Sequence, residues 1–377
     1  MRKILIVMGR YLPGYKDGGP VRSIKNLVDR LGTEYEFHIL TVDRDHGDTE
    51  AYPSIQCDTW NQVGDAMVWY VKPGGFKREV VSKLAAEVDL VYVCGCFNDY
   101  ARTVMTLKKD GQIQVPVVIA SMGLFSPGAF RIKYPKKKAY VTVLRLMGYF
   151  KNIAWSATSE EEAKDIRRHV GQDAKCYLAE DLPRKPIDIT REASSDEGTC
   201  KIIFLSRISR KKNLTHAAEI LTAWGQRYPN QEIVFDVYGT KEDLAYVEEC
   251  EEKLNALPTN VHYMYCGVAP AEEIIETFAK YDVFLFPTLG ENYGHVIFES
   301  MAGGCIPLIS DQTPWTEEKM NGLGRVLRND DMQKWIDTVE HYVMESTTAM
   351  QQLATDCMEF AREYHADEDA YRKILNG

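Results

Sequence analysis

Strand-like and helix-like runs alternate along the whole chain, and the alternation begins twice. In the first half, short apolar runs predict strands at residues 3–8, 36–42, 67–71, 90–94, 115–120 and 153–157. In the second half, predicted strands at 201–206, 233–238, 261–265, 281–286 and 305–309 alternate with predicted helices at 214–224, 244–257 and 271–280. This pattern is typical of mostly parallel sheets with helices on both faces. We therefore expect an α/β fold with two Rossmann-like, doubly wound domains facing a central cleft.

A polar stretch separates the two halves. It contains Pro183 and Pro186 and ends in the run 192–198. A length of 377 residues also fits about two domains. We expect an N-terminal domain over residues 1–182 and a C-terminal domain over residues 198–359, with a last helix from about residue 360 to 377 that packs back on the first domain.

The composition excludes several classes of protein. With 45% hydrophobic and 27% charged residues, the chain has the composition of a soluble globular protein. No apolar run approaches the roughly 18 to 20 residues that span a bilayer, and the run 4–8 is too short for a signal peptide. The nine cysteines are scattered, with no Cys-x-x-Cys pair, so we expect neither a zinc site nor a disulfide framework. A reducing, cytoplasmic location fits this usage.

Charge is distributed unevenly between the halves. Residues 1–180 hold 26 Lys and Arg against 21 Asp and Glu, whereas residues 181–377 hold 19 against 34. The acidic half argues against general nucleic-acid binding, and the basic half could meet an anionic partner.

Two glutamates frame a glycine-containing turn and the start of a helix in the second half. Glu291 follows a predicted strand, Gly294 lies in the turn, and Glu299 falls about two helical turns later. Eight positions at about 100° each leave the two carboxylates about 80° apart, so both can face one crevice. Carboxylates accept hydrogen bonds from sugar hydroxyls. The spacing alone equally fits a solvated loop residue and a partly exposed helix residue.

Two other strand-to-helix junctions carry candidate anion-binding residues. The strand at 201–206 is followed by Arg207 and Lys212, which suit a phosphate, although a basic loop can also serve solubility alone. The first strand is followed by Gly18 and Gly19, where the backbone can approach an anion, although such a pair can be a simple turn. The absence of Gly-x-Gly-x-x-Gly here counts against a dinucleotide-dependent dehydrogenase.

A basic stretch with interleaved aromatic residues runs from Phe130 to Asn152 and contains no acidic residue. Its composition fits either an anionic membrane surface or a solvated face over a core helix. Its positive residues are Arg131, Lys133, Lys136, Lys137, Lys138, Arg145 and Lys151. The Asp-x-Asp patterns at 43–45 and 367–369 are too short to predict a metal site, and we expect no metal.

Taken together, these motifs resemble the GT-B glycosyltransferases of family 4, also called glycosyltransferase group 1. Glu291-x7-Glu299 is similar to the paired-glutamate motif of the family, and Arg207 through Lys212 is similar to its diphosphate-binding loop. The segments 41–48, 121–127 and 157–162 are similar to members that act on cell-surface saccharides. The resemblance covers nearly the whole chain.

The resemblance implies that a sugar moves, with retention and without a metal, from a nucleoside-diphosphate sugar to a hydroxyl of a saccharide or lipid-linked acceptor. A UDP-sugar is favoured as donor. The charge distribution predicts no nucleic-acid partner, and the basic stretch from Phe130 to Asn152 motivates the hypothesis of an anionic inner membrane surface as a partner. The C-terminal domain would bind the nucleotide sugar and the N-terminal domain the acceptor. The implied catalytic residues are Arg207, Lys212 and Glu291. The implied donor-binding residues are Gly18, Gly19, Gly239, Cys266, Gly267, Val268, Asn292, Tyr293, Gly294 and Glu299. The acceptor or membrane residues are Met122, Gly123, Arg131, Lys133, Lys136, Lys137 and Lys138.

Three departures from the family pattern concern the acceptor side, one of which is that residues 180–182 stand where the family usually has an asparagine-glycine turn. Many members carry His at the end of the fourth strand, where this chain has Tyr92 and Cys94, and Met122 stands where others have Arg. A catalytically silent sugar-nucleotide-binding partner subunit and a sugar-nucleotide epimerase with the same fold therefore remain alternatives.

Overall fold

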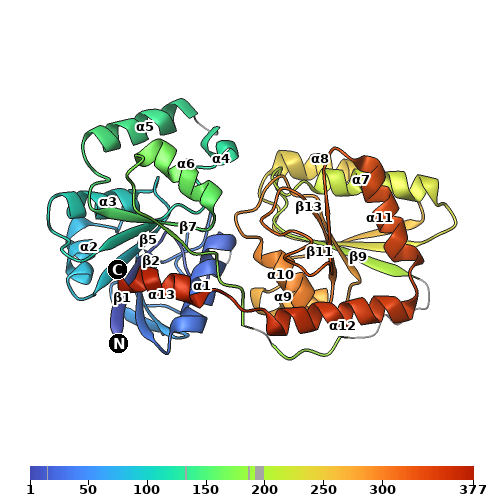
Figure 1. The fold of residues 1–377 in the computed structure, drawn as a ribbon, viewed down its shortest axis with the longest axis horizontal. Coiled ribbons are helices and arrows are strands. Elements are labelled where there is room, and N and C mark those ends of the chain that lie inside the picture. Colours follow the sequence, from blue (N-terminus) through green and yellow to red (C-terminus); the bar gives the residue numbers. More distant parts are fainter. Residues whose placement is uncertain (15, 132–133, 186, 192–198) are drawn as a thin grey trace. The chain divides into compact units, whose positions relative to one another are not determined.

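The chain forms two compact units in a computed structural model that describes residues 1–14, 16–131, 134–185, 187–191 and 199–377 (Figure 1). The first unit comprises Met1–Lys185 and Ala366–Gly377, and the second comprises Pro186–His365. The chain thus re-enters the first unit at Ala366, whereas we expected the return near residue 360. We predicted the linker between about Pro183 and Gly198, and of this stretch residues 186 and 192–198 lie outside the described residues.

The first unit is built on an eight-stranded sheet with the strand order β3-β4-β2-β1-β5-β6-β7-β8. All neighbouring pairs are parallel except β3 with β4. The strands are β1 (Arg2–Val7), β2 (Tyr35–Val42), β3 (Trp60–Val63), β4 (Ala66–Val71), β5 (Leu90–Cys94), β6 (Val117–Ala120), β7 (Ile153–Ala157) and β8 (Cys176–Leu178).

Helices cover both faces of this sheet because successive side chains of its strands point to opposite faces. Leu5 and Val7 of β1 join the core under α2 (Arg78–Ala85), α3 (Asp99–Lys109), α4 (Pro127–Arg131), α5 (Tyr134–Leu146) and α6 (Glu160–Val170). Ile4 and Ile6 join the other core, under α1 (Gly19–Leu31) and the last helix, α13 (Glu368–Asn376). An ion pair between Arg30 and Glu368 at 3.0 Å further fastens α13 to α1.

The second unit contains a six-stranded, fully parallel sheet in the order β11-β10-β9-β12-β13-β14. Its strands are β9 (Cys200–Leu205), β10 (Ile233–Tyr238), β11 (Val261–Gly267), β12 (Val283–Phe286), β13 (Ile306–Ser310) and β14 (Arg325–Leu327). Helices α7 (Leu214–Arg227), α8 (Leu244–Asn255) and α11 (Met332–Met344) pack together on one face of the sheet. The 3-10 turn η1 (Ala271–Glu273) leads into α9 (Ile274–Phe278), which packs with α10 (His295–Ala302) and α12 (Thr347–Glu363) on the other face (Figure 1).

Both sheets have a point at which the strand order reverses. In the second unit the chain starts at the central β9, adds β10 and β11 on one side, and then returns to add β12, β13 and β14 on the other. In open parallel sheets, ligands bind beyond the carboxyl ends of the strands at this reversal point. A ligand of the second unit is therefore expected beside the segments that follow β9 and β12. The predicted α/β class with two doubly wound domains is confirmed.

Candidate active site

The segments that follow β9 and β12 are joined by hydrogen bonds at the carboxyl end of the sheet. The Leu289 amide and the Thr288 hydroxyl both donate to the Lys211 carbonyl, at 2.8 and 3.0 Å. The Asn213 side chain donates to the Pro287 carbonyl at 2.9 Å, with Asn213 itself in a left-handed conformation just before α7. These contacts fix the positions of the two loops relative to each other.

Lys212 and Glu291 form a largely buried ion pair across this junction. Lys212 Nζ lies 2.6 Å from Glu291 Oε1, and the two side chains are 11% and 10% exposed. The Thr288 hydroxyl also lies 2.9 Å from the same Glu291 oxygen, so its single proton is shared between this oxygen and the Lys211 carbonyl. Burial lowers the pKa of Lys212 below its ordinary value, while the neighbouring Glu291 carboxylate opposes this shift. Glu291 is therefore no solvated loop residue, and that alternative interpretation of it is wrong.

Arg207 lies at the same loop but in a more open setting. Its side chain is 42% exposed and faces Glu242 at 3.3 Å. Pairs this exposed contribute about 0–1 kcal/mol, so an anion could take the place of Glu242 at small cost. The sequence motif did not indicate Glu242, which follows β10 and reaches Arg207 because β9 and β10 are neighbours.

Gly239 allows the ends of β9, β10 and β11 to approach one another closely. A Cβ atom at this position would lie 1.8 Å from the Ser206 carbonyl oxygen. The Gly239 amide donates a hydrogen bond to the Gly267 carbonyl at 2.8 Å. Two residues that were predicted to bind the nucleotide sugar are therefore in contact. Val268 beyond them is exposed, and burial raises the pKa of the half-buried Cys266 thiol.

The helix α10 begins at His295, just after the turn that follows Glu291. Gly294 caps it with φ 82°, and a Cβ there would come within 2.9 Å of Ile297. Tyr293 is buried and its carbonyl accepts the Trp315 indole N–H at 2.8 Å, which anchors the turn that also includes Asn292. Glu299 is only 2% exposed, so its alternative interpretation as a partly exposed helix residue is wrong.

In the first unit, Gly18 and Gly19 lie at the start of α1. Gly18 is the N-cap with φ 65°, and a Cβ atom at Gly19 would have no neighbour within 4 Å. The amino end of α1 therefore has open space for an approaching group. The expected contact of these glycines with the donor stays a prediction.

A buried carboxylate holds the loop that follows β6. Met122 and Gly123 have φ values of 53° and 71°. Glu162 accepts hydrogen bonds from the Gly123 amide at 2.6 Å and from the Ser121 hydroxyl. Its other oxygen accepts from the Thr158 amide and hydroxyl, each at 2.8 Å. Glu162 thus holds the loop that contains Met122 and Gly123, the two residues predicted to contact the acceptor substrate. The sequence did not reveal this role.

The predicted basic patch is not uniform. Arg131, Lys136 and Lys138 are exposed. Lys137 instead turns toward the protein, since its Nζ donates to the Ala129 carbonyl at 2.7 Å. Lys133 lies outside the described residues.

At the end of β5, where many family members carry a histidine, this chain has buried side chains. Tyr92 and Cys94 are both in the core, and burial raises the pKa of each. Neither side chain is therefore ionised near neutral pH. Among the described residues no group of three or more His, Cys, Asp or Glu side chains could hold a metal ion. No described helix is both long and apolar enough to cross a membrane.

A family model matches the second unit. Residues 187–363, which include every predicted site residue of the second unit, match the model of the glycosyl transferases group 1. No curated protein matches the chain.

Solved structures of similar fold cover nearly the whole chain. A sucrose-phosphate synthase from Thermosynechococcus elongatus matches with 13% identity and a TM-score of 0.69 over 100% of both chains. A UDP-forming α,α-trehalose-phosphate synthase from Burkholderia xenovorans, in complex with glucose-6-phosphate, matches with 12% identity and a TM-score of 0.71 over 100% of both chains. Anabaena HepE in complex with UDP and glucose matches with 14% identity and a TM-score of 0.67 over 100% of this chain and 99% of its own. Identities this low establish a shared fold, which is the GT-B fold, while the family match assigns residues 187–363 to the glycosyl transferases group 1.

Proposed function

We propose that the chain is a retaining, metal-independent hexosyltransferase that uses a nucleoside-diphosphate sugar, with UDP-sugars favoured. The acceptor is a hydroxyl of a saccharide or lipid-linked intermediate in cell-surface polysaccharide synthesis. The observation that carries this proposal is the buried Lys212–Glu291 pair beside the exposed Arg207, at the strand reversal between β9 and β12.

The cations act on the diphosphate leaving group. As the bond between sugar and phosphate breaks, negative charge develops on the diphosphate. Arg207 exchanges Glu242 for the diphosphate and donates two parallel hydrogen bonds to it. Lys212 adds a point charge in a partly dehydrated setting, where electrostatic interactions are stronger than in water. Backbone amides at the start of α10 add to this stabilisation, since helix amino ends attract anions.

Glu291 has two tasks in this proposal. Its Oε1 accepts from Lys212 and Thr288, which holds the lysine in place. Both of these donors, within the part of the chain that the structure describes, use Oε1, so Oε2 is left to accept from a hydroxyl of the transferred sugar. Glu299 is assigned to the ribose and the Gly239 and 266–268 region to the nucleobase.

Two of the similar structures support the choice of donor. The Burkholderia synthase is described as UDP-forming, and the Anabaena protein was solved with UDP and glucose. A cytoplasmic location is part of the proposal, because all nine cysteines are free thiols and suit a reducing compartment.

A donor panel tests the proposal. The protein is heated with each nucleotide sugar, since a ligand that binds only the native state raises the unfolding temperature. Release of nucleoside diphosphate is then measured with the stabilising donor, with and without saccharide acceptors. Acceptor-dependent release supports transfer. Stabilisation without turnover would indicate a silent binding subunit, and an epimerised sugar formed without acceptor would indicate an epimerase.

A further inference from the structure

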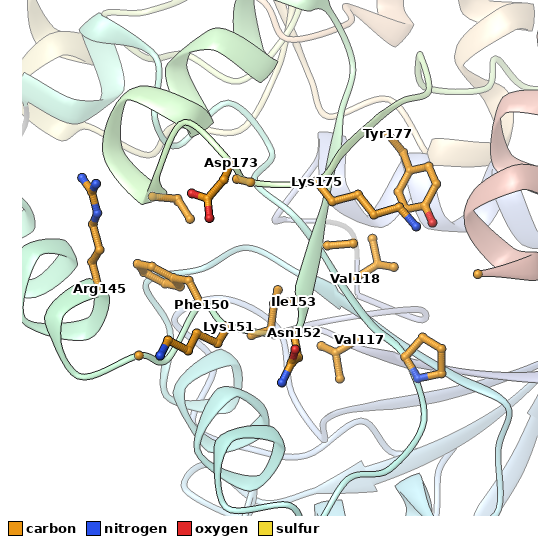
Figure 2. A pocket seen from close by; sticks show the side chains of 16 residues that line it. Val117, Val118, Arg145, Phe150, Lys151, Asn152, Ile153, Asp173, Lys175 and Tyr177 are labelled. Atoms are coloured by element: carbon orange, nitrogen blue, oxygen red, sulfur yellow. The ribbon is translucent and has the colours of Figure 1, made fainter.

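A cavity lies in the first unit, at the end of the sheet opposite the Met122–Gly123 loop. It has a volume of about 740 Å³ and is lined by residues at the amino ends of β6 and β7 and just before β8 (Figure 2). Apolar side chains, including Val117, Phe150 and Ile153, form part of its wall. Since substrates of parallel sheets bind at the carboxyl ends of the strands, this cavity is separate from the predicted acceptor region.

Three cations surround the cavity, and we call them the basic rim: Arg145, Lys151 and Lys175. They come from the end of α5, from the loop before β7 and from the segment before β8 (Figure 2). Among the described residues none of the three forms an ion pair with a carboxylate, and Lys175 lies over the Tyr177 ring at 4.5 Å. Asp173 is the single acidic side chain in the lining. Three cations that no carboxylate neutralises favour an anionic ligand.

Exposed apolar side chains stand next to the basic rim. Leu146 is 82% exposed, Met147 is 51% exposed and Val143 is 50% exposed, and we call these three the α5 tip. Leu146 and Met147 fall between Arg145 and Gly148, which both line the cavity. Apolar side chains exposed beside cations are typical of a surface that contacts the interface of an anionic bilayer.

We propose that this cavity binds the phosphate-bearing headgroup of an anionic lipid while the α5 tip enters the bilayer interface. The basic rim attracts the phosphate, and the apolar wall beside it suits an amphiphile better than an isolated inorganic anion. The contact thus centres on the end of α5 and the cavity, whereas the sequence placed it along the whole stretch 130–152. The proposal holds whichever sugar and nucleotide the second unit uses.

Vesicle sedimentation with the full chain tests the proposal. The vesicles contain either phosphatidylcholine alone or phosphatidylcholine with phosphatidylglycerol at about 3:1. The test variant is R145Q/K151Q/K175Q. The matched control is K72Q/K77Q/K164Q, which removes the same charge from exposed lysines of the same unit that do not line the cavity.

We expect the unaltered protein and the control to bind the anionic vesicles and not the neutral ones. Each cation near an anionic surface contributes about fivefold in affinity, so the rim variant should lose on the order of a hundredfold. Equal binding by the rim variant and the control would overturn the proposal.

Two further measurements separate the sources of phosphate. L146S/M147S keeps every charge and should also weaken binding to anionic vesicles by at least tenfold, whereas unchanged binding would refute insertion of the α5 tip. Glycerol phosphate at millimolar concentration should leave vesicle binding in place. If it abolishes the binding at a low concentration of vesicles, the cavity binds a soluble phosphate instead. Stabilisation by the nucleotide sugar is recorded for every variant, so a failure here is distinct from a failure of the donor site.

Discussion

At the scale of single residues, the donor site depends on how differently its two cations are held. Lys212 is buried against Glu291, whereas Arg207 is exposed and paired with Glu242 across the loop. The first arrangement fixes a charge before any ligand arrives. The second leaves a planar, bidentate donor free to exchange partners.

Replacing Arg207 tests the exposed cation. We expect Arg207→Ala to lower kcat/KM by a factor that corresponds to about 2–4 kcal/mol in activation free energy. This is the usual loss for one preorganised group that stabilises developing charge. Arg210→Ala is the matched control, because Arg210 belongs to the same loop and is exposed but pairs with Glu249 at 2.9 Å. Steady-state kinetics of both variants measures the effect. Near-normal turnover in Arg207→Ala would remove this residue from the mechanism.

The lowered pKa of Lys212 predicts the alkaline side of the pH profile. Lys212 stabilises the diphosphate only while protonated, and burial lowers its pKa. Activity should therefore fall as pH rises through a value below that of an ordinary lysine. Lys212→Arg keeps its charge at all accessible pH, so its profile should lose this alkaline limb. An unchanged limb in Lys212→Arg would assign the titration to another group.

The buried Lys212–Glu291 ion pair also predicts how single and double replacements change the unfolding temperature. Removing one member of a buried ion pair costs about 3–5 kcal/mol because the other charge is left uncompensated. Lys212→Met and Glu291→Gln should each lower the unfolding temperature, and the double variant should recover part of the loss while remaining inactive. Thermal unfolding and activity assays check this. Additive losses in the double variant would mean that the two side chains do not interact.

Contacts between residues that are close in sequence or that follow a recognisable motif could be predicted, whereas contacts between residues far apart in sequence could not. Arg207, Lys212 and Glu291 each lie in a loop that joins a strand to the next helix, so the strand-to-helix pattern indicated that they share the carboxyl end of the sheet. Glu242 lies 35 residues beyond Arg207 and meets it through the pairing of β9 with β10, which the pattern does not specify. The four hydrogen bonds to Glu162 likewise bring together segments from β6, β7 and α6 that only the folded sheet makes neighbours.

At the scale of elements, the long buried strands were predictable and the short edge strands were not. Strands β5, β7 and β10 match their predicted ranges because buried parallel strands read as continuous apolar runs. Strands β3, β8 and β14 were missed, since each has three or four residues and is largely half-buried, which leaves little apolar pattern. The predicted helix at 271–280 begins as a 3-10 turn and becomes α-helical only from Ile274.

An element-scale prediction concerns the loop after β6. Glu162→Ala removes the acceptor for two amides and two hydroxyls, so we expect a loss of about 3 kcal/mol in the free energy of unfolding. Glu161→Ala is the matched control, since Glu161 is the exposed neighbour in the same helical turn and should change stability by less than about 0.5 kcal/mol. Chemical denaturation measures both values. Equal stability of the two variants would contradict the holding role of Glu162.

At the scale of the whole molecule, the two units carry different chemistry. The second unit contains the family match and the cations beside α10. The first unit contains the Glu162-held loop at one end of its sheet and the basic rim at the other. The two-unit organisation was predictable from the repeated alternation of elements. The identity of the acceptor was not, because acceptor pockets are built from loops whose residues follow no general pattern.

The central claim is that the segments beyond the carboxyl ends of β9 and β12 bind a nucleoside diphosphate through Arg207 and Lys212. Calorimetric titration of the full chain with UDP tests it most directly. We predict saturable binding that weakens at least tenfold, about 1.4 kcal/mol, in Arg207→Ala and stays unchanged in Arg210→Ala. Equal affinity of all three proteins for UDP would contradict it.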